Sequence, residues 1–556
     1  MPWKDARVTS RWHPRAWRMS WSGVVGAVIG FALSMTPSLM PRPTLFMGLL
    51  GGISAAVGYG IAVVIAWGLR RAGTPEAGEP LRRRCWQVLA VAGPIIAIAA
   101  LIAGRMWQEE VRRLVGEDPA GVSIVTVPVI AVVAFTVILL IARAIRWIAH
   151  ALARLLNRLI PRPAARALSI LIVVLIAWWA ASGLLPSAFL SAMDGIYSAT
   201  NARTAPGIEQ PSSALRSGSP ESLVPWSTLG QEGRTFVASG PSAQQAGQFT
   251  GEPGIEPIRV YVGLDTAATP RERARIAVAE LERTGAFDRA VLVVAGVTGT
   301  GWLEPQSVSS IEYVWGGNTA IVATQYSYLP SWMSFLIDRQ RPAVSGQELF
   351  DAVYDAWSQR PAEARPKLIV YGLSLGSYAM QSAFATPGSI EVLTDGALFV
   401  GTPNFTEPWH YMELTRDPGT PEWKPVFENG RIIRFGPDST SLFALDTAWE
   451  SPRIAYLQHA SDPVVWWSYD LIAQRPDWLA EPRGPDVSPA MQWIPIVTFL
   501  QVTVDQFFGV DVPNGHGHNY PNTIVGAWVA VTEPQNWTAQ QTADLQAFID
   551  ASYPAP

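Results

Sequence analysis

The most informative segment of this sequence reads Lys367-Leu368-Ile369-Val370-Tyr371-Gly372-Leu373-Ser374-Leu375-Gly376. It joins a strand-like apolar run to a helix-like stretch over residues 377–385. A strand can reverse sharply into a helix only when small residues flank the turn, because larger side chains would collide there. The pattern therefore predicts a nucleophile elbow that exposes the hydroxyl of Ser374. Ser374 is the candidate nucleophile.

From residue 258 onward, strand-like and helix-like segments alternate. The strand candidates are 258–262, 290–295, 320–324, 367–371, 396–400 and 453–457, and the helix candidates before the elbow are 270–283 and 346–358. Ser345 and Glu348 have the spacing of a capping box at the start of the second helix. Such alternation predicts a mostly parallel sheet with helices on both faces. Together with the elbow, it predicts an α/β-hydrolase fold.

An acid and a base are expected later in the chain, because the catalytic order in this fold is serine, acid, histidine. Asp462 follows the strand candidate 453–457 and is the candidate acid. Of the four histidines after the apolar region, His410 and His459 precede Asp462. The remaining two, His516 and His518, lie just ahead of a helix-like run at 523–531, where the base belongs. Spacing leaves both open, and we favour His518 because it is nearer the start of that helix.

This set of residues implies acyl transfer through a covalent acyl-enzyme. The oxyanion formed on attack needs two backbone donors. One is Leu375, which follows the nucleophile, and the other belongs to the glycine-rich loop at 297–302 after an early strand. Val297 and Thr298 are the candidates in that loop.

The two late histidines could instead be metal ligands, but the pattern argues against it. Alternate residues of an extended segment point to opposite faces, which makes a poor shared set of ligands. Only Asp511 lies close by, and no cysteine does. We expect neither a metal site nor a cofactor.

The first third of the chain contains long apolar runs that we interpret as membrane spans. They cover residues 21–40, 44–67, 85–104, 122–142 and 168–185. Each is about long enough to cross ~30 Å of hydrocarbon as a helix. Pro37, Pro94 and Pro128 do not exclude this reading, because membrane helices tolerate proline. Residues 1–190 are therefore predicted to form an all-α bundle of about five transmembrane helices.

Positive charges predict the orientation of these spans. The N-terminal tail, the second loop and the fourth loop hold Lys4, Arg7, Arg11, Arg15, Arg18, Arg70, Arg71, Arg82, Arg83, Arg84, Arg143, Arg146, Arg154, Arg158, Arg162 and Arg166. The alternate loops hold only Arg42, Arg105, Arg112 and Arg113. Loops rich in Lys and Arg stay in the cytoplasm. With five spans the N-terminus is cytoplasmic and everything after Leu185 is extracytoplasmic. No cleavable signal peptide is apparent.

Charge divides the chain in the same way. Residues 1–190 carry 20 basic and 7 acidic side chains, whereas residues 191–556 carry 21 basic and 38 acidic ones. The acidic second part argues against a nucleic-acid partner, whose phosphates need a basic surface. Cys85 is the single cysteine, so the chain forms no intramolecular disulfide.

Residues 191–257 are rich in Ser, Gly, Pro, Ala and Gln and lack a sustained hydrophobic period. This composition is typical of a linker or a loosely structured collar. The expected organisation is therefore a transmembrane domain at 1–190, a linker or collar at 191–257 and an extracytoplasmic catalytic domain at 258–556.

The sequence resembles a bacterial family of membrane-anchored α/β-hydrolases with a multi-span N-terminal domain. The matching segments are Pro37-Ser38-Leu39-Met40-Pro41-Arg42, the 297–302 loop, Gly372-Leu373-Ser374-Leu375-Gly376, Ser461-Asp462-Pro463 and the segment 515–520. Members of this family, or of close relatives, resemble hydrolases of aminoacylated membrane lipids such as aminoacyl-phosphatidylglycerol. The resemblance implies a membrane-anchored serine esterase whose partners are the lipid bilayer and a lipid ester.

Two other functions remain open. The same triad would serve a cell-envelope acyltransferase if a sugar or lipid hydroxyl took the place of water. In a different class, the spans would carry out transport or assembly and the second domain would only bind. The near absence of ionisable residues within the spans speaks against transport, since transport paths usually contain some.

Overall fold

The computed structural model describes residues 19–75, 78–119, 121–180, 183 and 185–553. The chain divides into two compact units. The first, which we call the helical unit, comprises Met1–Pro37, Arg42–Glu109 and Ala120–Ile148. The second, the sheet unit, comprises Ser38–Pro41, Glu110–Pro119 and Ala149–Pro556. Two short segments from the N-terminal region therefore belong to the sheet unit.

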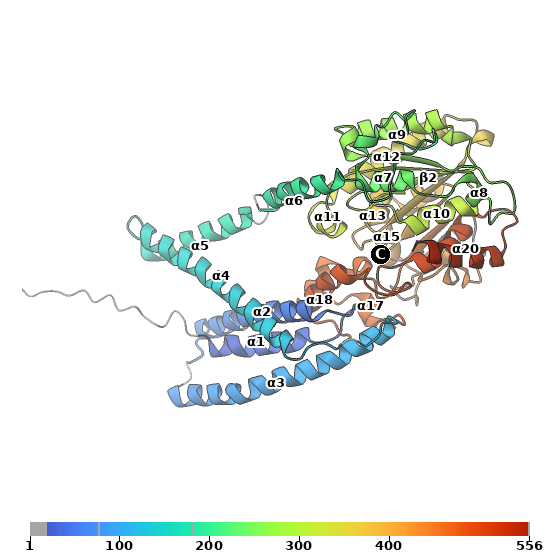
Figure 1. The fold of residues 1–556 in the computed structure, drawn as a ribbon. Helices are drawn as coiled ribbons and strands as arrows, with labels where there is room; N and C mark the ends of the chain where they lie inside the picture. Colours follow the sequence, from blue (N-terminus) through green and yellow to red (C-terminus); the bar gives the residue numbers. More distant parts are fainter. Residues whose placement is uncertain (1–18, 76–77, 120, 181–182, 184, 554–556) are drawn as a thin grey trace, which may run out of the picture. The chain divides into compact units, whose positions relative to one another are not determined.

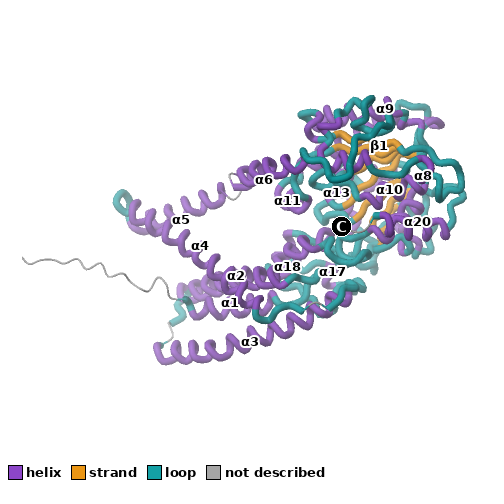
Figure 2. Tube along the Cα trace, in the orientation of Figure 1, coloured by secondary structure: helices purple, strands orange, loops and turns teal. Residues whose placement is uncertain are grey.

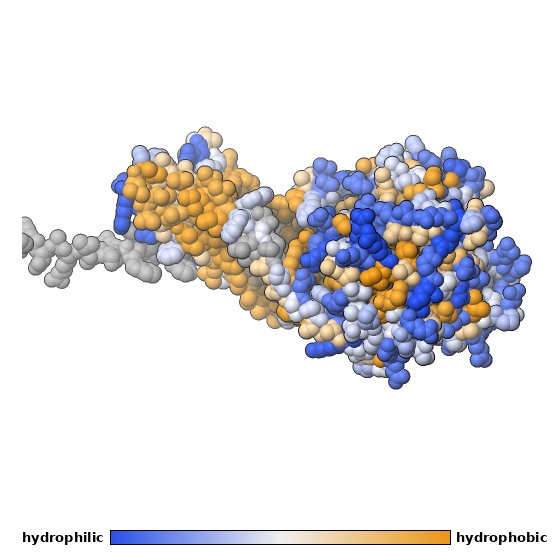
Figure 3. Space-filling model, turned by 90° about the horizontal axis from the view of Figure 1, so that it is seen from above, coloured by the Kyte–Doolittle hydropathy of each residue, from blue (hydrophilic) through white to orange (hydrophobic). Residues whose placement is uncertain are grey.

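The N-terminal region is built from helices (Figures 1 and 2). They are α1 (Trp21–Ser34), α2 (Thr44–Arg71), α3 (Glu79–Leu114), α4 (Thr126–Leu156) and α5 (Arg162–Trp179). Among the described residues, the four helices α2 to α5 are long and apolar enough to cross a membrane. Many of their Leu, Ile, Val and Trp side chains are exposed, and the part of this surface visible in Figure 3 is largely orange. An apolar surface of this kind is suited to lipid.

The expectation of a first span at residues 21–40 is wrong in length. Helix α1 has 14 residues, which corresponds to ~21 Å at 1.5 Å per residue. Pro37 explains the early end, because proline lacks an N–H and disfavours helical geometry in the residue before it. The structure therefore has four candidate spans in place of the five expected. The basic residues expected in the tail at 1–18, and residues 181, 182 and 184 of the fifth expected span, lie outside the described residues.

The sheet unit is built around a seven-stranded sheet in the order β1-β3-β2-β4-β5-β7-β6. The strands are β1 (Ile258–Val262), β2 (Val291–Gly296), β3 (Thr319–Thr324), β4 (Lys367–Leu373), β5 (Gly396–Val400), β6 (Ile433–Gly436) and β7 (Arg453–Leu457). Every pair of neighbours is parallel. The predicted, mostly parallel sheet is confirmed, and β4, which carries the elbow, is its central strand.

Helices cover both faces of the sheet (Figure 1). The connections from β1 to β2, β3 to β4 and β4 to β5 run in one direction along the sheet, and the connection from β2 to β3 runs in the other. Since parallel crossovers are right-handed, the two directions place helices on opposite faces. One layer contains α9 (Pro270–Thr284), α12 (Gln340–Ser358) and α13 (Leu375–Gln381); the other contains α10 (Pro305–Val314), α19 (Ile524–Thr532) and α20 (Ala539–Ser552).

Apart from α5, the remaining α-helices of the sheet unit are shorter or lie outside these layers. They are α6 (Leu185–Asn201), α7 (Gly230–Ala238), α8 (Ala243–Ala246), α11 (Ser331–Ile337), α14 (Pro387–Leu393), α15 (Glu407–Leu414), α16 (Pro463–Trp466), α17 (Asp477–Ala480) and α18 (Val497–Asp505). Helices α15 to α18 all come from the connections after β5 and β7, at the carboxyl edge of the sheet. They therefore lie where the fold places its ligands.

The start of α12 differs from the prediction. The helix begins at Gln340, and Ser345 is a buried residue inside it, so Ser345 and Glu348 do not form a capping box. Pro342 fits this earlier start, because proline is tolerated in the first turn of a helix. The buried hydroxyl of Ser345 instead lies 3.3 Å from that of Thr324.

Residues 191–257, expected to form a linker or collar, carry helices α6 to α8 and the turn Trp226–Thr228. Val224, Leu229, Phe236 and Val237 are buried in the same hydrophobic core as the sheet. A guanidinium N–H of Arg216 also donates to the carbonyl of Val237 at 3.0 Å. The second half of this segment therefore packs as part of the sheet unit, because its few apolar residues are placed where they can be buried.

Candidate active site

Ser374 occupies the turn between β4 and α13. Its backbone has φ 56° and ψ −126°, a conformation that residues other than glycine rarely adopt. Its amide donates to the carbonyl of Val400 at 2.9 Å, which fixes the turn against β5. A β-carbon on Gly376 would lie 2.2 Å from the carbonyl oxygen of Gly296. Glycine is thus required for α13 to lie this close to β2, and the turn has the backbone geometry of a nucleophile elbow.

Asp462 lies after β7 and caps the N-terminus of α16. Its Oδ1 accepts the amide of Val464 at 2.8 Å. Its Oδ2 lies 2.7 Å from Nδ1 of His518 and accepts the hydroxyl of Tyr520 at 2.6 Å. The carboxyl group is fully buried, so these hydrogen bonds take the place of water around its charge. Tyr520 was not predicted from the sequence.

The other ring nitrogen of His518, Nε2, is the one that can accept a proton. A carboxylate can only accept, so Nδ1 of the neutral ring carries the proton and Nε2 is left as the basic nitrogen. Nε2 is buried and has no hydrogen-bond partner among the described residues. The amide of His518 donates to the carbonyl of Gly509 at 2.6 Å, and this hydrogen bond holds the backbone at His518.

Ser374 and His518 line the same cavity, whose volume is about 410 Å³. Its walls are mainly aromatic and aliphatic and include Trp302, Trp332, Phe335, Leu373, Val400, Val464, Phe507 and Val510. Glu304 is the only carboxylate among the lining residues, and none of them is Lys or Arg. The cavity is therefore suited to a substrate with a large apolar part.

Glu304 faces this cavity from the N-terminus of α10. Its carboxylate accepts the amides of Gln306 and Ser307 at 3.0 and 2.6 Å. Burial raises the pKa of Glu304, and these hydrogen bonds partly oppose the rise. The sequence pattern gives no sign of this residue, because capping glutamates are common and its place in the cavity depends on the fold.

His516 is not among the residues that line the cavity. Its Nδ1 lies 3.3 Å from Oδ2 of Asp486, and the hydroxyl of Ser461 donates to the same oxygen. Burial works to raise the pKa of Asp486, but the hydrogen bonds from His516 and Ser461 outweigh it and lower the pKa. Because Ser461 also accepts the amide of Gly517 at 2.8 Å, this group supports the loop that carries His518.

The candidate oxyanion donors differ in their availability. Leu375 is the first residue of α13, and an N–H in that position has no acceptor within its own helix. Thr298 lines the cavity, but its amide donates to the carbonyl of Trp302 at 2.9 Å. Val297 directly follows β2 and is buried beside the elbow. The geometry favours Leu375 and Val297 over Thr298.

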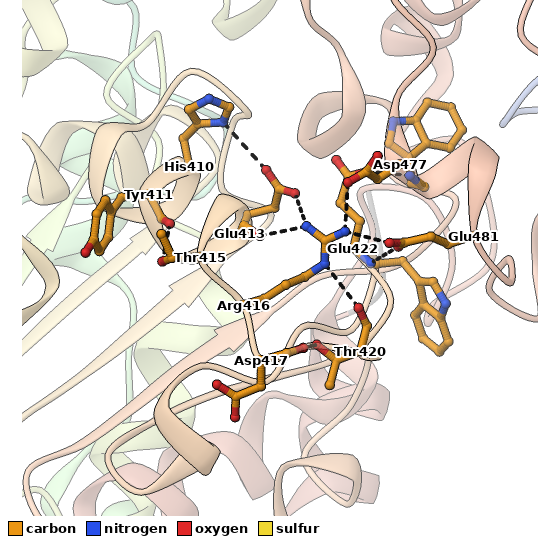
Figure 4. A network of polar contacts seen from close by, with 12 residues as sticks. His410, Tyr411, Glu413, Thr415, Arg416, Asp417, Thr420, Glu422, Asp477 and Glu481 are labelled. Atoms are coloured by element: carbon orange, nitrogen blue, oxygen red, sulfur yellow. Dashed lines mark hydrogen bonds and ion pairs between the residues drawn. The ribbon is translucent and has the colours of Figure 1, made fainter.

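A second polar network surrounds Arg416 (Figure 4). Its guanidinium lies 2.8 Å from Glu413, 2.9 Å from Asp477 and 2.7 Å from Glu481. Glu422 joins the group, since its amide donates to Glu481 at 2.8 Å. Three carboxyl groups thus contact one arginine, an excess of negative charge that burial makes costly. Among the described residues, no group of three or more His, Cys, Asp or Glu is arranged to hold a metal ion.

A serine on an elbow at the centre of a parallel sheet, with a buried Asp–His pair in the loops after later strands, defines an α/β-hydrolase. The comparisons with known sequences agree. The profile of the Alpha/beta-hydrolase family matches residues 258–545, and that of the Alpha/beta-hydrolase family N-terminus matches residues 35–241. The first match covers more than half of the chain, which therefore belongs to the α/β-hydrolase family. No curated protein and no solved structure matches the chain.

Proposed function

We propose that this protein is a membrane-anchored serine esterase with Ser374 as nucleophile, His518 as base and Asp462 as orienting acid. The observation that carries the proposal is the hydrogen bonding of the two ring nitrogens of His518. Its Nδ1 is held by Asp462 at 2.7 Å, and its Nε2 has no partner among the described residues of the cavity that Ser374 also lines. A ring held on one side and basic on the other is what a general base needs.

The reaction starts when the Ser374 hydroxyl attacks an ester carbonyl and Nε2 of His518 takes its proton. Asp462 stabilises the imidazolium, and the amides of Leu375 and Val297 hold the oxyanion. The carbon–oxygen bond to the alcohol then breaks, and His518 returns the proton to the departing alcohol. A water molecule, deprotonated by the same Nε2, cleaves the acyl-serine and releases the acid.

His518 is preferred to His516 because the two histidines have different partners. His518 contacts Asp462, the acid in the position that this fold uses. His516 contacts Asp486 and keeps about 29% of its side chain exposed. We assign His516 a supporting role, in which its ion pair with Asp486 holds the loop that carries the base.

A lipid ester is the proposed substrate class. Trp332 and Phe507 line the cavity and pack against each other with ring centroids 5.3 Å apart. Both rings remain more than one third exposed. Aromatic side chains that line a cavity and remain partly exposed are suited to a membrane interface. The four candidate spans of the same chain support a site that works at a membrane.

Within this class, an aminoacyl-phospholipid is the specific proposal. It rests on the family resemblance, and two features of the cavity support it. Glu304 supplies a carboxylate for the free ammonium group of an aminoacyl ester. No Lys or Arg lines the cavity, so nothing there favours an anionic acyl group.

We further propose that the part of the sheet unit after α5 is extracytoplasmic. Leu39 and Met40, between α1 and α2, and Val115, just after α3, are buried in the same hydrophobic core as the strands. A loop that is packed into this core lies on the same side of a membrane as the sheet. The arginine-rich segments at 70–84 and 143–166 would then lie on the opposite side, which is cytoplasmic by the positive-inside rule. This argument holds whether or not α1 crosses the membrane.

The test of the triad is reaction of the full-length protein with a fluorophosphonate probe, which labels only activated serines. We expect labelling of the wild type, none in Ser374→Ala, and a loss of roughly a hundredfold or more in rate for His518→Ala and Asp462→Asn. His516→Ala is the matched control and should retain most of the rate. If His516→Ala loses labelling and His518→Ala keeps it, the assignment of the base is wrong.

The test of the substrate is a panel of lipids presented in detergent micelles. Release of alanine or lysine from aminoacyl-phosphatidylglycerol, absent in Ser374→Ala, supports the specific proposal. Cleavage of diacylglycerol or p-nitrophenyl esters without any release of amino acid contradicts it and leaves the esterase in place. Transfer of the acyl group to an added hydroxyl acceptor in preference to water would indicate an acyltransferase.

A further inference from the structure

The segment Ser38-Leu39-Met40-Pro41, which we call the 38–41 loop, precedes β1 by more than two hundred residues but belongs to the sheet unit. Ser38, Leu39 and Met40 are fully buried. Leu39 and Met40 lie in the same hydrophobic core as the strands, whereas the nearby Met35 lies in a separate core of the N-terminal helices. The loop is thus a buried part of the sheet unit.

The carboxylate of Asp505 accepts three hydrogen bonds from this loop. Asp505, the last residue of α18, is fully buried. Its Oδ1 accepts the hydroxyl of Ser38 at 2.9 Å, and its Oδ2 accepts the amides of Leu39 and Met40 at 3.0 and 3.4 Å. Hydrogen bonds to a buried charge are stronger than those between neutral groups. Asp505 therefore determines where the loop lies.

The residues after Asp505 form part of the candidate active site. The short helix Gln506–Phe508 follows directly, and Gln506, Phe507 and Val510 line the cavity. Gly509 accepts the amide of His518 at 2.6 Å. The segment that follows α18 therefore forms part of the cavity wall and also holds the backbone of His518, the proposed base.

The 38–41 loop also packs against the residue that precedes the base. Gly517 has φ +53°, and a β-carbon there would lie 2.6 Å from the carbonyl oxygen of Gly509, 2.8 Å from Cγ2 of Val512 and 3.0 Å from Sδ of Met40. Only glycine fits among these three neighbours. Met40 is thus one of the residues that confine the backbone at residue 517 and, with it, the position of His518.

We propose that Asp505 is a positioning residue, which acts through the 38–41 loop to hold the cavity wall and His518 in the geometry needed for catalysis. The inference rests on the proposed function, because it takes His518 as the base. It assigns the N-terminal region a role beyond anchoring: a loop between two of its helices completes the active site. An active site tolerates little displacement, and a shift of ~1 Å can lower the rate about a hundredfold.

The test compares Asp505→Asn with Glu280→Gln in the full-length protein. Glu280 is an informative control because its buried carboxylate also holds an upstream segment, accepting the hydroxyl of Ser222 and the amide of Val224. It lies on α9 and does not line the cavity. Both variants replace one carboxylate oxygen with an NH2 group, which donates and cannot accept a hydrogen bond.

The measurements are the melting temperature, the fraction folded, kcat and KM for p-nitrophenyl butyrate, and the rate of fluorophosphonate labelling per folded molecule. We expect both variants to melt at lower temperature. Only Asp505→Asn should show a fall in kcat and labelling rate of about tenfold to a hundredfold per folded molecule. Equal rates per folded molecule in Asp505→Asn and Glu280→Gln would overturn the inference, since Asp505 would then be merely structural.

Two further outcomes are informative. If Asp505→Asn does not fold, Ser38→Ala replaces it, because this variant removes only one of the donors to Asp505. A several-fold fall in kcat per folded molecule then supports the inference, and an unchanged kcat overturns it. If both the wild type and Glu280→Gln are inactive, the proposed function is overturned and this inference with it. If both are active, any loss of rate in Asp505→Asn is due to Asp505 itself.

Discussion

The hydroxyl of Tyr520 donates to Oδ2 of Asp462 at 2.6 Å, the same oxygen that lies 2.7 Å from Nδ1 of His518. Burial raises the pKa of Tyr520 well above its usual value, and the Asp462 charge adds to the rise. Tyr520 therefore keeps its proton and remains a donor at neutral pH. It holds the carboxylate that in turn contacts His518, the proposed base.

Tyr520→Phe should lower kcat by about tenfold, because a hydrogen bond to a charged group contributes roughly 1.5–3 kcal/mol and only part of it orients the base. The matched control is Tyr456→Phe, which removes a buried hydroxyl that donates to Gln381 at 2.8 Å. Steady-state kinetics with a p-nitrophenyl ester provide the measurement. A kcat for Tyr520→Phe equal to that of Tyr456→Phe would show that the phenol only adds stability.

Glu304→Gln should reduce kcat/KM for lysyl-phosphatidylglycerol about tenfold more than for a neutral ester. The physical reason is the loss of a charge-assisted contact to the ammonium group, while the neutral substrate loses nothing comparable. The exposed Glu363→Gln is the control for a change in net charge. Identical losses for both substrates in Glu304→Gln would mean that Glu304 only caps α10.

Replacement of Trp332 and Phe507 by serine should weaken the action on lipid in vesicles more than the action on a soluble ester. The two partly exposed rings supply apolar surface beside the cavity, which can contact a bilayer but gains nothing comparable from a dissolved substrate. Tyr411→Ser, at an exposed aromatic position on α15, is the control. Rates are measured with vesicles and with p-nitrophenyl acetate. A larger loss for the soluble ester would contradict a membrane-facing role.

The proposed orientation can be tested with a membrane-impermeant maleimide on intact cells. In a Cys85→Ser background, Glu221→Cys in the sheet unit should be labelled from outside, and Arg83→Cys in the second loop should be labelled only after permeabilisation. Both positions are exposed. The reverse pattern would place the catalytic site in the cytoplasm.

The network around Arg416 predicts a pH dependence of stability. Burial raises the pKa of Glu413 to about 7; Arg416 opposes the rise, and Asp477 and Glu481 add to it. The folded protein then keeps a proton that the unfolded chain releases above its ordinary pKa near 4.5. Stability is therefore fully present below that pKa and is lost as pH rises to about 7, by up to about 3 kcal/mol.

Thermal melts between pH 5 and pH 7.5 measure this effect. Glu413→Gln cannot titrate, so it should flatten the curve and raise the melting temperature at neutral pH. Glu428→Gln, at an exposed position, should leave the slope as it is in the wild type. A slope unchanged by Glu413→Gln would show that Glu413 does not hold the proton.

The central part of the fold could be predicted because its signals are local. The elbow at Ser374 follows from an apolar strand and two glycines, and the parallel sheet follows from alternation. Strand β6 was not predicted, since Arg434 in its middle suggests an exposed loop. In the structure that guanidinium is buried and donates to the carbonyls of Gly430 and Leu442 at 2.7 and 2.8 Å. These hydrogen bonds depend on backbone groups outside the strand, so the local sequence pattern does not indicate them.

The site residues were predicted only as far as order and spacing allow. His516 and His518 lie in the same loop, and only their tertiary partners, Asp486 and Asp462, distinguish them. Asp486 lay outside the segments singled out, and Tyr520 lay within 515–520 without an assigned role, because its contact with Asp462 depends on the fold. The role of the 38–41 loop was also missed, although its residues were singled out, because its partner Asp505 is 466 positions away from Leu39.

That separation in sequence has a consequence for how the protein is made. Asp505 is synthesised more than four hundred residues after Leu39 and Met40. Until then, the backbone amides of these two residues lack the carboxylate that accepts from them. The 38–41 loop must therefore stay accessible until α18 has been made, and closure over so long a separation is a slow step in folding. The final position of the loop, and of the cavity wall that follows Asp505, is thus set late in folding.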